Sequence, residues 1–136
     1  MLQWKETYAT KHKIVDDQHK KLFDIVNGFE AAVRNKIAEA SIQQTLQALG
    51  DYVKTHFADE ERIMEFVRCS SCAENKKAHA GFLAVYTKSQ HRFQSEGYSD
   101  ALANELLKVA QEWIIQHICG IDISLRYCPC PEGNQE

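Results

Sequence analysis

Apolar residues recur every three or four positions along four long segments, which is the spacing that places them on one face of an α-helix. The four stripes are Leu22, Val26, Phe29 and Val33; Ile42, Leu46, Leu49 and Val53; Phe82, Tyr86 and Phe93; and Leu102, Leu106, Val109 and Trp113. The two prolines lie at positions 129 and 131, so no strong helix breaker interrupts these segments. The pattern predicts helices over about residues 17–37, 41–66, 73–93 and 99–119, the last with Ser99 as its N-cap.

Only short links join the predicted helices. Helices of about 20 residues connected in this way pack as antiparallel neighbours. The sequence therefore predicts an all-α fold, an antiparallel up-down-up-down four-helix bundle that forms a single domain over residues 1–136. An N-terminal arm, from residue 1 to about 15, and a short C-terminal tail, residues 120–136, lie outside the helices.

Composition narrows the class of protein. Hydrophobic residues make up 44% of the chain and charged residues 26%, which is typical of a globular protein and argues against disorder. The formal net charge is -3, so there is no basic field for nucleic acid and we expect no such partner. Neither a run of apolar residues long enough to span a bilayer nor a signal-peptide pattern is present, so we expect no membrane insertion.

The cysteines bear on the cellular compartment. There are five of them, Cys69, Cys72, Cys119, Cys128 and Cys130. An odd number without a secretory signal favours a reducing compartment, so we expect a cytoplasmic location. Cys69 and Cys72 form one CxxC motif with no second ligand pair, and we interpret the five as incidental thiols. A redox-sensing role for them is the alternative.

Polar residues continue the apolar stripes at one end of each predicted helix. Extending the four stripes by three or four residues at a time leads to His19, to His56 and Glu60, to Asn75 and His79, and to His117. In an up-down bundle these positions fall at the same end, so the imidazoles should meet in one layer. Buried imidazoles and a buried carboxylate need partners, and a metal ion satisfies all of them together. The pattern therefore predicts a metal site in the bundle core.

Two carboxylates accompany the imidazoles. His56 and Glu60 are four residues apart, on one helix face and suited to chelation. His117 and Asp122 are five apart, about 140° around an ideal helix, so they share a metal only if the helix changes conformation near Gly120. Mostly nitrogen donors with two carboxylates favour iron over calcium or magnesium, and the carboxylates could bridge two ions.

These residues, in this order, resemble the hemerythrin family, specifically the single-domain bacteriohemerythrins. The matching segments are Trp4, then Val-Asp-Asp-Gln-His-Lys-Lys-Leu-Phe at residues 15–23, His-Phe-Ala-Asp-Glu-Glu at 56–61 with Met64, His-Ala-Gly-Phe at 79–82, and Trp-Ile-Ile-Gln-His-Ile at 113–118 with Asp122. The resemblance covers nearly the whole chain. It implies the four-helix bundle, so the fold prediction is not independent of it.

The resemblance implies a non-haem di-iron centre that binds O2 reversibly, for storage, delivery or sensing, and no enzymatic activity. Glu60 and Asp122 would bridge two iron ions, Fe2+ or Fe3+, together with an oxo or hydroxo group. His19 and His56 would hold the iron that is open to O2, and His79 the other iron together with His117. A delivery or redox partner protein would be a further, unidentified component.

A hydrophobic wall should keep water and protons from this centre. Trp113, Ile114 and Ile118 are the candidates, because they lie within one turn of His117. Plain packing in the core is the alternative interpretation for all three.

One position departs from the family pattern. The third helix of the family carries two histidines four residues apart, and here the first of them is Asn75. Three arrangements stay open: a di-iron site with an oxygen or water ligand, a site with one firmly held ion and one weakly held ion, or a site that binds O2 poorly. An iron-dependent enzyme that handles peroxide or nitric oxide is the alternative function, beside a redox-sensing domain.

Overall fold

The computed structural model describes residues 1–35, 39–121, 125 and 128, and all regular structure in them is helical. The bounds of the long helices are α1 (Lys13–Arg34), α2 (Glu39–Phe66), α3 (Cys72–Glu96) and α4 (Asp100–Gln116). A short 3-10 helix, η1 (Glu6–Tyr8), precedes them, and a π-helical turn, η2 (His117–Ile121), follows α4 directly. The predicted all-α class is therefore confirmed.

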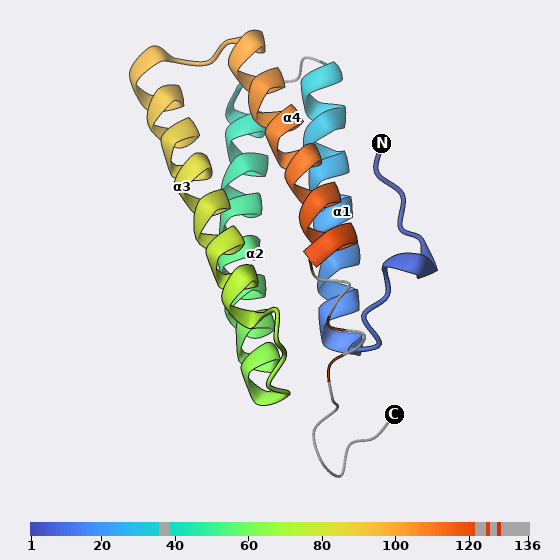
Figure 1. The fold of residues 1–136 in the computed structure, drawn as a ribbon. Coiled ribbons are helices and arrows are strands. Elements are labelled where there is room, and N and C mark those ends of the chain that lie inside the picture. Colours follow the sequence, from blue (N-terminus) through green and yellow to red (C-terminus); the bar gives the residue numbers. More distant parts are fainter. Residues whose placement is uncertain (36–38, 122–124, 126–127, 129–136) are drawn as a thin grey trace.

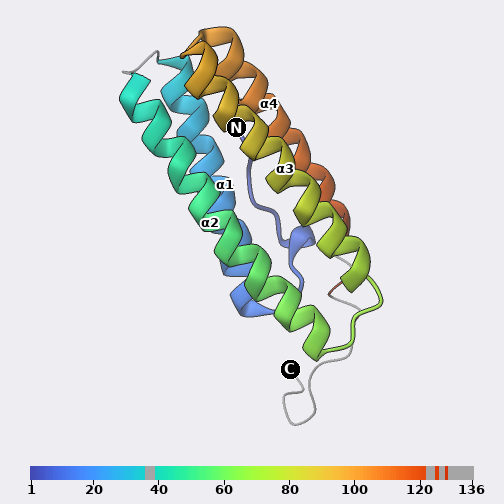
Figure 2. The same cartoon turned by 90° about the vertical axis from the view of Figure 1, so that its left-hand side faces the viewer.

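The four long helices run alternately up and down, side by side (Figure 1). Neighbours in the sequence pack together, as α1 on α2, α2 on α3 and α3 on α4, and α4 closes the bundle against α1. The same arrangement is visible from the side (Figure 2). The predicted up-down-up-down bundle is thus confirmed. The start of α1, the end of α2, the start of α3 and the end of α4 lie at one end of it.

Helix α1 begins four residues before the predicted start, at Lys13. Asp16, in its first turn, accepts hydrogen bonds from the backbone N–H and the hydroxyl of Thr10, both at 2.8 Å. An acidic side chain in this position satisfies donors that precede the helix and interacts favourably with its N-terminus. The predicted N-cap of α4 is confirmed, because the Ser99 hydroxyl accepts a hydrogen bond from Leu102 N–H at 3.1 Å.

The other helix bounds also shift. Helix α2 begins at Glu39, two residues before the predicted start, and α3 ends at Glu96, three residues beyond its predicted end. Gly97 follows α3 with φ of +79°, a left-handed conformation that glycine adopts without strain and that terminates a helix.

The N-terminal arm lies along α1 (Figure 1). Asn27 binds the backbone of Leu2 twice, accepting from its N–H and donating to its C=O, each at 2.9 Å. Trp4 contacts Phe23 edge-to-face, with ring centroids 5.8 Å apart. A side chain that pairs with both polar groups of one residue holds the arm in a defined register on the helix.

The buried apolar residues form two clusters. The larger one, the main cluster, runs along the bundle and includes Leu22, Phe57 and Ile118. The smaller one, the end cluster, consists of Val15, Met64, Val67, Cys69 and Leu125. Along α1 and α2 the polar stripe residues fall between these two clusters, so apolar layers cover the polar layer on both sides.

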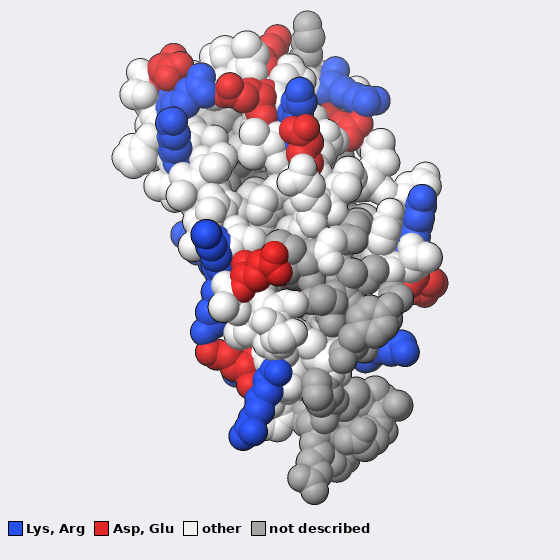
Figure 3. Space-filling view, viewed as in Figure 1, with Lys and Arg blue, Asp and Glu red and all other residues white. Residues whose placement is uncertain are grey.

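The surface is mixed in charge. On the face shown in Figure 3, basic and acidic side chains are interspersed, and neither sign forms a broad patch. In the described part of the chain no helix combines the length and the apolar composition that crossing a membrane requires.

Candidate metal centre

The structure brings the polar stripe residues together in one layer of the bundle. Helix α1 contributes His19, α2 contributes His56 and Glu60, α3 contributes Asn75 and His79, and the end of α4 contributes His117. Each of them is at most 2% exposed. Four imidazoles, one amide and one carboxylate therefore share one buried layer of the bundle, which we call the chamber. Asp122, the remaining predicted ligand, lies outside the described residues.

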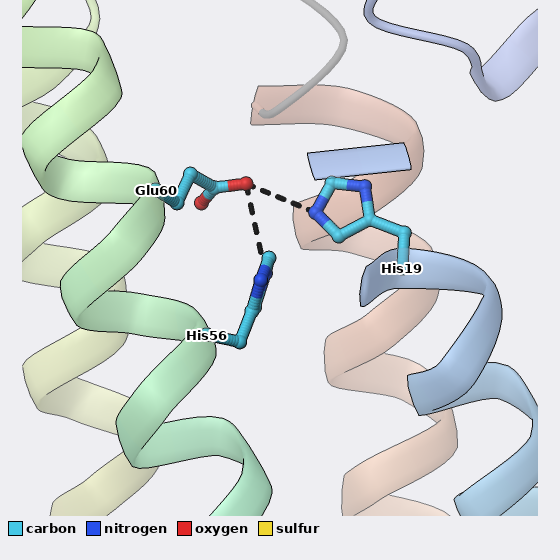
Figure 4. A group of neighbouring side chains, drawn as sticks. All are labelled: His19, His56 and Glu60. Atoms are coloured by element: carbon cyan, nitrogen blue, oxygen red, sulfur yellow. Dashed lines mark hydrogen bonds and ion pairs between the residues drawn. The ribbon is translucent and has the colours of Figure 1, made fainter. Parts of the chain in front are cut away.

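The two oxygens of Glu60 face separate pairs of imidazoles. Oε2 lies 2.9 Å from Nε2 of His19 and 3.6 Å from Nε2 of His56 (Figure 4). Oε1 lies 3.0 Å from Nε2 of His79 and 3.9 Å from Nε2 of His117. The layer thus contains two sets of three potential ligands, each set with its donor atoms within 4.8 Å of one another, and Glu60 belongs to both.

The outer nitrogen of His56 is held by a neutral partner. Its Nδ1 lies 2.7 Å from Oε1 of Gln18, an acceptor, so Nδ1 carries the hydrogen and donates it. The amide nitrogen of Gln18 donates in turn to Asp59 at 2.8 Å. This tautomer leaves a lone pair on Nε2, which is buried, has no hydrogen-bond partner and faces the Glu60 carboxylate. Two electron-rich atoms facing one another in a dry chamber require a cation or a proton between them.

The outer nitrogen of His79 is held by a charged partner. Its Nδ1 donates to Oε2 of Glu61 at 2.8 Å, while its Nε2 faces Glu60. The ring therefore lies between two carboxylates, and its inner nitrogen must carry either a proton or a metal ion. A metal ion that binds here would displace that proton.

Burial and hydrogen bonding set the charge states of the layer. Burial, together with the charges of the neighbouring imidazoles, lowers the pKa of His56 to about 3, against the attraction of Glu60. Burial raises the pKa of Glu60, but hydrogen bonds from His19 and His79 outweigh this effect and hold the pKa well below its ordinary range. A neutral imidazole and an ionised carboxylate are the forms that bind metal ions.

Asn75 contacts Glu60 instead of presenting a nitrogen donor to the chamber. Its amide nitrogen donates to Oε1 of Glu60 at 2.7 Å and lies 2.9 Å from the sulfur of Met64. Its carbonyl oxygen, Oδ1, is buried without a hydrogen-bond partner. The oxygen of Glu60 that faces His79 and His117 therefore has the amide as an additional neighbour.

Comparison with known proteins decides the family. A family model described as the hemerythrin HHE cation binding domain matches residues 10–125. The chain belongs to the hemerythrin family. It is 32% identical to a bacteriohemerythrin of Methylococcus capsulatus over 126 residues, which cover 90% of each chain.

Other hemerythrins match over a similar length. A bacteriohemerythrin of Stenotrophomonas maltophilia is 26% identical over 122 residues, which cover 90% of this chain and 77% of the relative. A myohemerythrin of Theromyzon tessulatum is 26% identical over 124 residues, which cover 91% of this chain and 90% of the relative. Hemerythrins bind O2 at a non-haem di-iron site, and the resemblance inferred from the motifs is confirmed.

The donors in the chamber fit the iron ions of a hemerythrin. Each oxygen of Glu60 has two imidazole nitrogens at 2.9–3.9 Å, and nitrogen donors combined with a carboxylate suit iron. Nε2 of His56 is buried, has no hydrogen-bond partner and faces a carboxylate oxygen, so a cation would satisfy both atoms. The chain's own chemistry therefore agrees with the cation-binding description of the family.

Aromatic rings cover the half of the hemerythrin chamber that contains His79 and His117. Phe57 stacks on His79 with ring centroids 3.9 Å apart, and Trp113 stacks on His117 at 4.3 Å. Ile114 and Ile118, predicted as part of a hydrophobic wall, are buried in the main cluster. Stacked aromatic rings of this kind shield the imidazoles from water and restrict their rotation.

The end of α4 departs from α-helical geometry at His117. His117 begins η2, a π-helical turn that runs to Ile121. A π turn holds more residues than an α turn, so residues five apart come closer in direction than the ~140° of an ideal helix. A change of conformation before position 122 was expected near Gly120, and the structure contains one, although Asp122 itself is outside the described residues.

Three contributors to the hemerythrin chamber were missed at the sequence level: Gln18, Glu61 and Phe57. Each of them is the immediate neighbour of a stripe residue, about 100° away around the helix. A search that follows only the i, i+3 and i+4 positions passes over them. Two of them could have been found from the sequence, because Gln18 and Glu61 are polar residues next to a buried histidine or glutamate.

Proposed function

We propose that this hemerythrin holds two iron ions, Fe2+ or Fe3+, with an oxo or hydroxo bridge, and binds O2 reversibly. The proposal is supported by the position of Glu60, whose two carboxylate oxygens each face a different pair of imidazoles. His19 and His56 would hold one ion, and His79 and His117 the other. Glu60 would bridge them, and Asp122 would be the second bridge, an assignment that rests on the family pattern.

The iron pair supplies a reversible two-electron exchange with O2 when it is bound. The chain orients the donors and keeps the surroundings dry. Gln18 and Glu61 hold the imidazoles of His56 and His79 by their outer nitrogens, so that the inner nitrogens face the chamber. Phe57 and Trp113 cover two of the rings. Exclusion of water and of mobile protons is what allows bound O2 to leave again unchanged.

The two ions should be held unequally. The His79–His117 half has one nitrogen donor fewer than the family pattern, and the amide at that position is engaged with Glu60. The oxygen of Asn75 is at best a weak ligand. We therefore expect one tightly bound ion on the His19–His56 side, if Glu60 and the second bridge complete its ligands, and a second ion that is lost first on dilution or chelation.

The decisive experiment combines a metal count with reversible O2 binding. The purified chain is loaded with Fe2+ without oxygen, the iron per chain is counted, and the sample is exposed to air and then returned to an O2-free atmosphere. We expect a visible charge-transfer band that rises on exposure and falls on removal. His56→Ala should abolish the band, and His91→Ala should leave it unchanged, because His91 is exposed and lies outside the chamber. Irreversible oxidation by air would contradict the proposal.

The alternative activity has its own outcome in the same experiment. An enzyme that handles peroxide or nitric oxide would consume those substrates over many turnovers, and His56→Ala would abolish the consumption. O2 uptake and release without such turnover supports a binding protein. A cytoplasmic location stays part of the proposal and is tested by cell fractionation.

A further inference from the structure

A disulfide joins two parts of the chain that are 59 residues apart. Cys69 lies in the link between α2 and α3, Cys128 lies beyond η2, and their Cα atoms are 5.2 Å apart, within the usual range for this bond. The interpretation of all five cysteines as incidental thiols is therefore wrong for these two. Connectivity of this kind cannot be deduced from the sequence, because the partners are brought together only by the fold.

The position of Cys69 is set by the backbone of the link. Arg68 has a φ of +55°, so the chain turns sharply after α2. The N–H of Cys69 then donates to the C=O of Met64 at 2.9 Å, which closes the end of the helix. The side chain of Cys69 is buried, with 5% of its surface exposed.

A third cysteine lies next to this bond. The N–H of Cys72 donates to the C=O of Cys69 at 3.1 Å, and a turn closed in this way holds the two Cα atoms within about 7 Å. Cys72 is a free thiol, half-buried, and packs against the end cluster together with Cys128. A thiol, a disulfide and a solvent-accessible side chain are the components that thiol–disulfide exchange requires.

The disulfide belongs to the apolar cluster that adjoins the candidate metal centre. In the end cluster, Val15 is one turn before His19 and Met64 is one turn after Glu60. The sulfur of Met64 contacts the amide of Asn75 directly. The disulfide therefore joins the α2–α3 link to the chain beyond η2 within the end cluster, whose Val15 and Met64 are the members adjacent to the chamber.

We propose that Cys69, Cys72 and Cys128 form a thiol–disulfide exchange site whose Cys69–Cys128 bond fastens the chain beyond η2 to the α2–α3 link. In the exchange, the Cys72 thiolate attacks the sulfur of Cys69. The Cys69–Cys128 bond breaks, a Cys69–Cys72 bond forms, and Cys128 takes up the proton that Cys72 released, without net oxidation. A dithiol reductant opens either bond by supplying two electrons and two protons, and its oxidised disulfide form restores the bond.

The consequence for the metal centre rests on the proposed function. The fastened segment follows His117 and contains position 122, where the family pattern has its second bridging carboxylate. When Cys128 is released, Leu125 loses a covalent anchor three residues away, and the end cluster that covers the chamber is weakened. The state of the three cysteines should therefore control how firmly the metal ions are retained.

Thiol trapping in the metal-free full-length chain tests the exchange site. The protein is equilibrated in mixtures of reduced and oxidised dithiothreitol, quenched in acid, alkylated and mapped by mass spectrometry. We expect a Cys69–Cys128 bond in the wild type under oxidising conditions, and a Cys69–Cys72 bond in Cys128→Ser. Cys130→Ser, altered two residues away, is the matched control and should keep the wild-type pairing. Alkylation of Cys69 and Cys128 as free thiols under oxidising conditions, or an unpaired Cys69 in Cys128→Ser, would overturn the proposal.

Release of Co2+ to a chelator tests the control of the metal centre. We expect release to be faster by about tenfold, the scale on which neighbours of metal ligands act, from Cys128→Ser and from the reduced wild type. The oxidised wild type and Cys130→Ser should release it slowly. Equal release rates in all four samples would contradict the inferred effect of the cysteines on metal retention. If neither Co2+ nor iron binds in either redox state, both the proposed function and the effect of the cysteines on metal retention are wrong. Thiol trapping then still tests the exchange site by itself.

Discussion

The amide nitrogen of Asn75 donates a hydrogen bond of 2.7 Å to Oε1 of Glu60, the carboxylate oxygen that faces His79 and His117. In the ligand arrangement proposed above, a donor to the metal would thus be replaced by a donor to the carboxylate. This relationship makes the two halves of the centre chemically different, although Glu60 is common to both.

Replacement of Asn75 by histidine should restore a second firmly held ion. The imidazole would offer a nitrogen lone pair on the side of His79 and His117, where the present amide offers a hydrogen-bond donor. We expect Asn75→His to approach two irons per chain under conditions in which the wild type retains fewer, as measured by elemental analysis after gel filtration. Asn75→Gln is the control, because it retains an amide. An unchanged iron count in Asn75→His would contradict unequal binding.

Loss of the charge on Glu61 should weaken metal binding without unfolding the chain. Glu61 accepts the hydrogen bond from the outer nitrogen of His79 at 2.8 Å and its side chain is 28% exposed. We expect Glu61→Gln to lower the affinity for Co2+ by about 10-fold or more, the usual scale for such partners, in a competition titration with a chelator. Glu65→Gln is the matched control, since Glu65 pairs with Lys76 on the surface and should leave the affinity unchanged.

The metal-free protein should become less stable as the pH falls from 6.5 toward 3. Burial lowers the folded-state pKa of His56 from 6.5 to about 3, so in this window the unfolded chain takes up a proton that the folded chain does not. The pKa of Glu60 is also lowered on folding, which acts in the same direction below pH 4.5. Each group contributes a slope of at most about 1.4 kcal/mol per pH unit. Urea denaturation at pH 7, 6, 5 and 4 measures it, and a flat profile would contradict the assigned protonation states.

Substitution by alanine should lower the stability of the protein at Gly50 and raise it at Gly81. A Cβ on Gly50 would clash with the hydroxyl of Tyr86, whereas a Cβ on Gly81 would have no neighbour within 4 Å. The Tyr86 hydroxyl cannot move away freely, because it donates to the C=O of Leu46 at 2.6 Å. We expect Gly50→Ala to destabilise the protein by about 1–3 kcal/mol, and Gly81→Ala to stabilise it by about 0.5–1 kcal/mol. Thermal unfolding of the metal-free chains checks both values.

The features that could be predicted from the sequence follow from helical periodicity. A buried stripe has a period of three to four residues, so continuing the stripe placed His19 and Glu60 in the core. The alternation of helix directions then placed the four imidazoles at one depth. Both inferences depend on distances along single helices, which the sequence contains directly.

The features that were missed depend on contacts between segments. Asp16 extends α1 because Thr10 folds back onto it, and the partner of Cys69 is decided by where the chain passes after η2. Whether Asn75 binds a metal or a carboxylate depends on the placement of Glu60, which belongs to another helix. None of these has a period or a fixed spacing, so no pattern along the chain reports them.

Both candidate ion positions share one ligand, the Glu60 side chain of α2. Because Glu60 provides an oxygen to each pair of imidazoles, the separation of the two positions is determined within a single carboxylate and not by how far apart two helices happen to lie. Small sliding or tilting of α1 and α4 would change the angles at which their histidines approach, while the pairing itself would persist. The spacing of the two positions therefore depends above all on the placement of this single residue.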